Sequence, residues 1–310
     1  MCFRHNWIDE KCGFMSDEVI EKLISDMSEF NELETVVIAG IGEPLLHKSV
    51  FDIIGKCKNL GLCVEIITNA MLLTKENAQK LCEAQTDRIW ISMDGFSKED
   101  YEKVQRKGEY ETLIENIEYF NSIKNDSRLA LTFVILNDNI DQLMYINRFA
   151  NKYDIDMLNI SHAIPIEPIE RNLTLFDDPD FIIGKTHRYG SPSDFKPICP
   201  FIDSEVCFVR WDGDVAPCMQ LLHDTYTYLF EQKRRIHRIS FGNIMEENLK
   251  AIYDNKDFIK LRNMICDEDF PKCVYCEGCE LREENKQDCM FNTFPTCGAC
   301  LWSTGKIRCP

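Results

Sequence analysis

The segment ETVVIAGIGEPLL at residues 34–46 decides the fold of this chain. Its first half, Val36–Ala39, is a short apolar run that stops at a glycine, as a buried strand of a parallel sheet does before a loop. Its second half contains Gly40 and Gly42, which let the backbone approach a ligand, and a Glu43-Pro44 turn that directs peptide groups outward. The segment therefore predicts a strand whose carboxyl end carries a binding loop.

Strands and helices alternate along the first half of the chain. Apolar residues at helical spacing predict helices at 16–30, 48–60, 75–84, 110–123 and 141–153. Short runs rich in β-branched residues predict strands at 34–40, 63–68, 88–93, 129–136 and 157–161. The alternation predicts an α/β protein with a parallel sheet wrapped by helices, so functional residues should lie at the carboxyl ends of the strands.

The composition changes twice after this region. Residues 164–198 are rich in Pro, Asp and Ser and show no periodicity, so we interpret them as a connector. The rest of the chain is cysteine-rich and irregular, apart from one expected helix at 247–262. We therefore expect an α/β domain over residues 1–163, then the connector, then a cysteine-rich domain over residues 199–310.

Charge and hydropathy exclude several classes of protein. The chain has 310 residues, of which 52 are acidic and 35 basic, and its net charge of −17 argues against nucleic acid or an anionic membrane as a partner. A hydrophobic content of 45% excludes wholesale disorder. The apolar runs are far shorter than the ~18 residues of a membrane helix, and the polar N-terminus is no signal peptide. We expect a cytoplasmic protein.

Cysteine is the most informative residue type. Of the 16 cysteines, five precede residue 199 and eleven lie from there onward. Without a secretion signal the thiols stay reduced, and such a concentration of them indicates metal binding. Four cysteines occur singly in apolar patterns, as buried thiols do: Cys57, Cys63, Cys82 and Cys266. The candidate metal ligands are the other ten of the C-terminal region: Cys199, Cys207, Cys218, Cys273, Cys276, Cys279, Cys289, Cys297, Cys300 and Cys309.

Spacing alone leaves two metals open. Cys273-x2-Cys276 and Cys297-x2-Cys300 are two pairs separated by twenty residues, a spacing that suits a zinc ribbon. Two 4Fe–4S clusters would need eight thiolates, and ten are available. Zinc would leave most of the remaining cysteines without a role.

Polar residues also follow the strands. Asn69 comes directly after the strand at 63–68, and Ser92 and Asp94 face one side near the end of the strand at 88–93. Hydroxyl, amide and carboxylate groups at such an edge suit a ribose or an amino acid. Taken singly each feature is weak, because Gly-Glu-Pro and Asp-Gly sequences are most often plain turns.

Together these features resemble the radical S-adenosylmethionine (SAM) superfamily with a C-terminal SPASM-type auxiliary cluster domain. Met1-Cys2-Phe3 resembles the tail of the superfamily's C-x3-C-x2-C motif, and Cys207…Gly213-x4-Cys218 resembles the opening of the SPASM motif. The resemblance implies a partial (β/α)6 barrel lacking its first strand, a radical SAM cluster with Cys2 as a ligand, and two auxiliary 4Fe–4S clusters. It also implies S-adenosylmethionine bound by Phe3, Gly40, Gly42, Glu43, Pro44, Asn69, Ser92 and Asp94.

The closer resemblance is to the radical maturases associated with tungsten-containing aldehyde:ferredoxin oxidoreductases. It rests on the strings MCFRHNW, GIGEPLLH, FVRWDGDVAPCMQLLH, FGNI and the terminal DCMFNTFPTCGACLWSTGKIRCP. It implies an enzyme that generates a 5′-deoxyadenosyl radical to mature such an oxidoreductase or its tungsten–pterin cofactor. The implied partners are that oxidoreductase and a ferredoxin-like electron donor. Arg210, Trp211, Asp212 and His223 become candidate substrate contacts, although an isolated His or Trp is more often structural.

The chain departs from the superfamily pattern at two places. It carries only Cys2 of the three cluster cysteines, and Cys12 is too distant to substitute, so we expect the missing cysteines and one strand to be encoded upstream of Met1. As printed, the chain should not cleave S-adenosylmethionine by itself. Sulfatase-type maturases carry an Asp base after a cysteine, whereas Met219 follows Cys218 here, which disfavours oxidation of a Ser or Cys side chain.

Two other classes of function remain open on the sequence. One is a radical SAM maturase that modifies a ribosomal peptide, which an upstream precursor-binding segment would favour. The other is a non-catalytic metal-binding protein that holds zinc or auxiliary clusters only. The sequence by itself does not identify the substrate.

Overall fold

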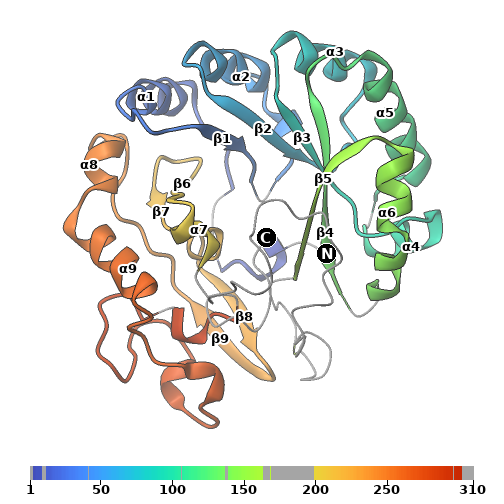
Figure 1. The fold of residues 1–310 in the computed structure, drawn as a ribbon. Helices are drawn as coiled ribbons and strands as arrows, with labels where there is room; N and C mark the ends of the chain where they lie inside the picture. The colour runs from blue at the N-terminus through green and yellow to red at the C-terminus, as the bar shows by residue number, and fades with distance from the viewer. Residues whose placement is uncertain are drawn as a thin grey trace.

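The computed structural model describes residues 3–8, 12–40, 42–105, 107–136, 139–162, 168, 199–295 and 297–301. A five-stranded parallel sheet has its strands in chain order: β1 Thr35–Ile38, β2 Cys63–Thr68, β3 Arg88–Ser92, β4 Arg128–Ile135 and β5 Ile155–His162. Six helices accompany it: α1 Asp17–Met27, α2 Val50–Asn59, α3 Lys75–Glu83, α4 Lys98–Val104, α5 Tyr110–Ile123 and α6 Leu143–Lys152. Figure 1 shows the sheet as an open arc with these helices along its outer side.

The two faces of the sheet differ in burial, as alternation along each strand requires. On the outer face Ile66, Ile91 and Phe133 are fully buried in the core beneath the helices. On the inner face Ser92 and Thr132 are only half-buried. The outer face thus carries the core, whereas the inner face is buried at Glu65, Trp90 and Ala130 and only half-buried at Ser92 and Thr132.

The predicted elements of this half are confirmed, with one omission. Strand 63–68 and helix 110–123 have their predicted bounds, and Ser16 caps α1 by accepting a hydrogen bond from Val19 N at 3.3 Å. Helix α4 was not predicted, because it is a single short segment of charged residues with little apolar periodicity. The connector at 164–198 lies outside the described residues except for position 168.

The C-terminal region contains short elements around its cysteines. They are α7 Pro200–Asp203, β6 Phe208–Val209, β7 Val215–Ala216, β8 Thr225–Leu229, β9 Gln232–Ile236, α8 Leu249–Tyr253 and α9 Lys256–Cys266. The prediction of one helix over 247–262 is wrong: Asn255 interrupts it and caps α9 by accepting a hydrogen bond from Phe258 N at 2.7 Å. The prediction that Cys266 is buried is also wrong, because this last residue of α9 is exposed.

Helix α1 belongs to two hydrophobic cores. Met27 packs into the barrel core and Val19 into the core of the C-terminal region, while Leu23 packs against both. Figure 1 shows α1 between β1 and α8, where the arc of the sheet passes into the C-terminal elements. Within the described residues no helix combines the length and the apolar character needed to cross a membrane.

A buried carboxylate fixes this junction. Asp26 is 2% exposed and accepts hydrogen bonds from Leu249 N at 2.9 Å and from Asn248 Nδ2 at 3.1 Å, at the start of α8. Lys22, one turn earlier in α1, pairs with the same carboxylate at 2.5 Å. The anion therefore satisfies donors at the N-terminus of α8 and neutralises a lysine of its own helix.

We expect Asp26→Ala to lower the free energy of unfolding by about 2–3 kcal/mol, because the buried Leu249 N–H would lose its acceptor and Lys22 its counter-charge. Urea denaturation followed by circular dichroism measures this. The matched control is Asp17→Ala in the same helix, where an exposed carboxylate pairs with exposed Lys48 and its loss should change stability by less than about 1 kcal/mol. Equal effects of the two substitutions would contradict this account of the junction.

Candidate functional site

Glu43 connects the loop after β1 to the end of β2. Its Oε1 accepts hydrogen bonds from Thr68 Oγ1 at 2.8 Å and from Leu45 N at 3.0 Å, and its Oε2 accepts one from Asn69 N at 3.0 Å. The carboxylate thus joins two neighbouring strand ends and caps the 3-10 turn Pro44–Leu46. Glu43 therefore stabilises the conformation of the predicted binding loop.

His47 attaches the same loop to the segment before α1. Its Nδ1 accepts a hydrogen bond from Ser49 N at 3.2 Å, so the proton lies on Nε2, which donates to Met15 O at 2.9 Å. The ring also contacts the edge of Phe14, with centroids 5.6 Å apart. The loop at 42–47 and the segment at 12–16 therefore form one structural unit.

Asp94 is buried beyond the end of β3. Its Oδ1 accepts a hydrogen bond from Val134 N at 2.9 Å and its Oδ2 one from Gln105 Nε2 at 2.8 Å, while Asn139 Nδ2 donates to its backbone carbonyl at 3.0 Å. Burial raises the pKa of this carboxyl to about 6, although the two hydrogen bonds oppose the increase. One oxygen thus joins the end of β3 to β4, and the other holds Gln105 at the end of α4.

Three polar residues form a row across the inner face of the sheet. Ser92 of β3 is in register with Thr132 of β4, which is in register with Asn159 of β5, so the three side chains point the same way. All three residues are half-buried, and none of their side chains forms a hydrogen bond with another described residue. Asn69 lies one residue beyond the Thr68–Ile91 pair and extends the row onto the next strand. The row is a set of donors and acceptors at the depth where a barrel holds its ligand.

Several predicted site residues cannot be placed. Cys2 and Cys309 lie outside the described residues, as do the side chains of Phe3 and Cys297. The segment that follows Cys2 is placed, and it lies against β8. Trp7 stacks on His223 with ring centroids 3.7 Å apart, and Thr225 Oγ1 donates a hydrogen bond to Asn6 O at 3.1 Å. His223 is 5% exposed and thus packs on this segment.

One group of thiols lies between α7 and the C-terminal segment. Burial raises the pKa of Cys218, and the neighbouring thiols of Cys199 and Cys300 raise it further. Burial likewise raises the pKa of Cys199 to about 11. Cys207 is buried as well, which raises its pKa, while the nearby charge of Arg262 lowers it. Cys199, which is one of the ten predicted ligands, lies beside Cys218 in this group.

A second group lies in the segment after α9. The thiols of Cys289, Cys276 and Cys279 all raise the pKa of Cys273, whose largest shift comes from burial, while Arg234 lowers it. Cys273 begins one short 3-10 turn, Cys276 follows it, and Cys279 precedes the next. Two groups of thiols are what two clusters would require.

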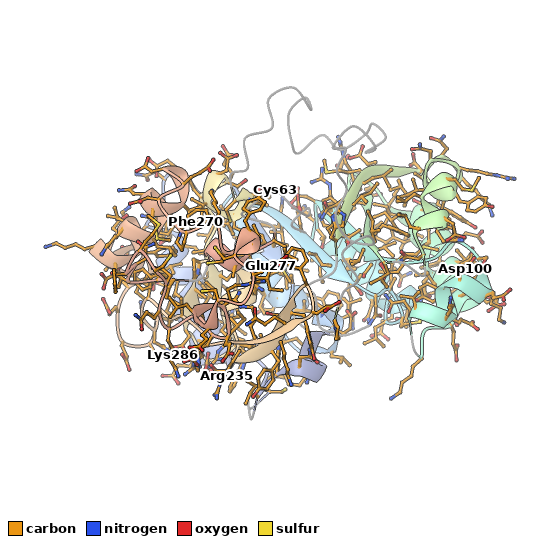
Figure 2. All side chains as sticks on the ribbon, turned by 90° about the horizontal axis from the view of Figure 1, so that it is seen from below. Cys63, Asp100, Arg235, Phe270, Glu277 and Lys286 are labelled. Atoms are coloured by element: carbon orange, nitrogen blue, oxygen red, sulfur yellow. The ribbon has the colours of Figure 1, made fainter. Side chains whose placement is uncertain are left out.

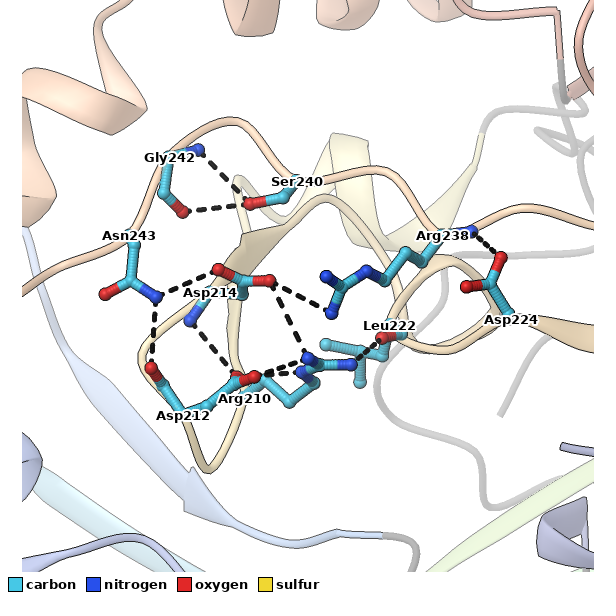
Figure 3. A network of polar contacts seen from close by, with 9 residues as sticks. All are labelled: Arg210, Asp212, Asp214, Leu222, Asp224, Arg238, Ser240, Gly242 and Asn243. Carbon is cyan, nitrogen blue, oxygen red and sulfur yellow. Dashed lines mark hydrogen bonds and ion pairs between the residues drawn. The ribbon is translucent and has the colours of Figure 1, made fainter. Parts of the chain in front are cut away.

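A hairpin positions the first group. Gly213 has a φ of 90° in the turn between β6 and β7, and a Cβ there would lie 2.7 Å from Asn243 Oδ1. Arg210 donates to both oxygens of Asp212, and Asn243 Nδ2 donates to Asp214 Oδ1 at 2.9 Å (Figure 3). Arg210 and Asp212 therefore pair with each other and stabilise the hairpin that carries Cys218.

The donor chemistry fits iron–sulfur clusters. No three His, Cys, Asp or Glu side chains among the described residues lie close enough together to hold a single metal ion. A cubane binds each thiolate at a different iron, so its ligands stand further apart than those of one zinc ion. Two buried arginines, Arg234 and Arg282, lie beside the cysteines and were not predicted. An arginine in an alternating strand such as QKRRI gives no sign that it is buried.

Asp94→Asn should remove a pH-dependent part of the stability. Because the pKa of Asp94 is raised to about 6 from 3.8, its contribution is fully present below the unfolded value and is lost as the pH rises through about 6. The wild type should therefore lose about 1 kcal/mol from this group between pH 5 and pH 7, and the variant should not.

Urea denaturation at several pH values measures the difference. Asp52→Asn on the surface of α2, where the side chain is 64% exposed, should keep the wild-type profile. A profile for Asp94→Asn that parallels the wild type would show that this carboxyl does not titrate in the range.

Comparisons with known proteins agree with this architecture. A Pyrococcus furiosus protein named tungsten-containing aldehyde ferredoxin oxidoreductase cofactor-modifying protein is 27% identical over 100% of this chain and 92% of its own length. A probable GTP 3′,8-cyclase of Methanococcus maripaludis is 30% identical over 54% of this chain and 55% of its own.

Two solved structures show the same fold. Streptococcus suis SuiB bound to S-adenosylmethionine has a TM-score of 0.56 at 18% identity, over 83% of this chain and 63% of SuiB. Native anSMEcpe with bound AdoMet has a TM-score of 0.58 at 15% identity, over 96% of this chain and 89% of its own. Residues 1–150 match the family model of the radical SAM superfamily, and residues 199–280 match that of the SPASM iron–sulfur cluster-binding domain. The chain therefore belongs to the radical SAM superfamily and carries a SPASM domain.

Proposed function

We propose that this radical SAM enzyme matures a tungsten-containing aldehyde oxidoreductase or its tungsten–pterin cofactor. The observation that carries the proposal is the similarity to the cofactor-modifying protein of P. furiosus, which extends over the whole of this chain and 92% of that relative. The cyclase similarity covers about half of each chain. The name of that relative indicates that it acts on GTP, a small heterocyclic molecule. This favours a small heterocyclic substrate such as a pterin, rather than a polypeptide, for the present chain.

The residues at the carboxyl ends of the barrel strands, here called the barrel rim, have different roles in this proposal. When bound, the radical SAM cluster and S-adenosylmethionine supply a 5′-deoxyadenosyl radical that abstracts hydrogen from the substrate. Cys2 would be one thiolate ligand of that cluster. Glu43 joins the Pro44–Leu46 turn to the end of β2, so that peptide groups of this loop would be available to the methionine part of the cosubstrate, and Asp94 joins the end of β3 to β4.

The polar row would orient the substrate. Ser92, Thr132 and Asn159 offer hydroxyl and amide groups on the inner face, where a ribose or a heterocycle needs both donors and acceptors. The side chain of Phe3 and the backbone of Gly40 and Gly42 complete the predicted cosubstrate site. We expect a ferredoxin-like protein to deliver the electron and the reaction to take place in the cytoplasm.

We expect a form of the protein that contains the complete C-x3-C-x2-C motif, isolated anaerobically, to release 5′-deoxyadenosine from S-adenosylmethionine under dithionite, and residues 1–310 alone to release none above background. Cys2→Ala should abolish the product while most of the iron remains, because the SPASM clusters use other thiols. The matched control is Cys12→Ala, since Cys12 is exposed and its thiol accepts only a 3.0 Å hydrogen bond from Arg4. Chromatography quantifies the product. Loss of product in Cys12→Ala but not in Cys2→Ala would reverse the assignment.

The tungsten assignment needs a separate experiment. Co-expression of a tungsten-containing aldehyde oxidoreductase with the wild-type protein should raise both its aldehyde oxidation and its bound pterin content severalfold over co-expression with Cys2→Ala. Tungsten supply and oxidoreductase level are held equal in the two strains. An oxidoreductase that is fully active with the Cys2→Ala protein would refute the proposed role without affecting the assignment of the radical SAM chemistry.

A further inference from the structure

Two arginine side chains are buried among the thiols of the SPASM domain. Arg234 is 3% exposed in the middle of β9, where its Nε donates to Arg282 O at 3.0 Å and one terminal nitrogen donates to Ala299 O at 3.5 Å. Arg282 is 5% exposed and donates to Cys276 O, while its Nε has no acceptor among the described residues. Both guanidinium groups are thus held by carbonyls of the cysteine-bearing segments.

Neither arginine has a carboxylate partner in the described part of the chain. The thiols of Cys300 and Cys273 lie near Arg234 and would carry an opposite charge only as thiolates, whereas Arg282 is a like charge that disfavours the protonated form of Arg234. Burial lowers the pKa of Arg234 to about 10, which still leaves it charged at neutral pH. Two cations therefore lie buried side by side, and the thiols beside them carry no balancing charge until they are deprotonated.

Such an arrangement is unstable unless an anion joins it. A buried charge costs several kcal/mol unless it is paired, and a carbonyl oxygen offers a dipole but no neutralising charge. A 4Fe–4S core with four thiolate ligands is a net dianion when oxidised, and one-electron reduction adds a further negative charge. The negative charge of such a cluster is what the two guanidinium groups lack, and thiols that could hold one, those of Cys273 and Cys300, lie beside Arg234.

We propose that Arg234 and Arg282 are the counter-charges of an auxiliary cluster held beside them by Cys273 or Cys300, and that Arg234 sets the reduction potential of that cluster. The proposal rests on the SPASM domain's iron–sulfur chemistry and is independent of the tungsten substrate. The electron taken up on reduction raises the negative charge of the cluster by one, so a nearby fixed cation favours the reduced form. Removing that cation must lower the potential.

Three single variants of the whole protein test this. Arg234→Met removes the charge and keeps an apolar side chain of similar length. Arg234→Lys keeps the charge but loses the planar fork of donors. Arg235→Met removes the same charge from the next residue of β9, which is exposed and lies near the edge of the SPASM domain in Figure 2. Iron and sulfide content and an EPR-monitored redox titration under dithionite are the measurements.

Arg234→Met should shift the reduction equilibrium of one auxiliary cluster at least tenfold towards the oxidised form, which for one electron is about 59 mV. If that variant releases the cluster instead, its iron content should fall by one cubane while Arg234→Lys retains it. Arg235→Met should titrate close to the wild type, because solvent screens its charge.

Three results would overturn the proposal. They are a wild-type potential in Arg234→Met at full iron content, an equal shift in Arg235→Met, and loss of iron in Arg234→Lys and Arg234→Met alike. The last result would show that Arg234 stabilises the cluster site through its hydrogen bonds to carbonyl groups and not through its charge. Each measurement is made without the oxidoreductase, so failure here leaves the tungsten proposal untouched.

Discussion

The buried carboxylate of Asp26 determines how the two halves of the molecule meet. It lies in a helix that packs into both hydrophobic cores, and it satisfies the first backbone donors of α8 across the junction. Because an unpaired carboxylate or N–H at this depth is costly, the halves have one favourable arrangement. The rim of the barrel and the thiol groups of the SPASM domain inherit their relative position from this contact.

Carboxylates at the barrel rim serve the fold as much as the chemistry. Glu43 and Asp94 were predicted as cosubstrate contacts, and both use their oxygens to join neighbouring strand ends. The groups that remain available are hydroxyls and amides, such as those of Ser92 and Asn159. A rim built in this way holds its shape with charge and offers neutral hydrogen-bonding groups to the ligand, so it does not have to desolvate a carboxylate when a ligand binds.

The sequence predicts the elements that repeat and misses those that depend on distant partners. Strand 63–68 and helix 110–123 have strong periodicity, and their bounds agree with the structure. Asn255 is a typical helix N-cap and indicates the break before α9, but the apolar residues on either side of it continue the helical spacing and led to the prediction of one helix. The proximity of Cys199 to Cys218 depends on a hairpin that brings together residues nineteen positions apart, which motif spacing around Cys207 does not reveal. The burial of Arg234 has no local signal at all.

The stack of Trp7 on His223 has a consequence for the order in which the chain acquires its structure. The hydrogen bond between Thr225 and Asn6 joins residues 219 positions apart, and no closer strand supports this segment among the described residues. Contacts of such sequence separation form late, because most of the chain must be ordered before they repay the entropy of loop closure. The described neighbours of Cys2 are therefore among the last residues to reach their final positions, although they lie far ahead of Thr225 in the sequence.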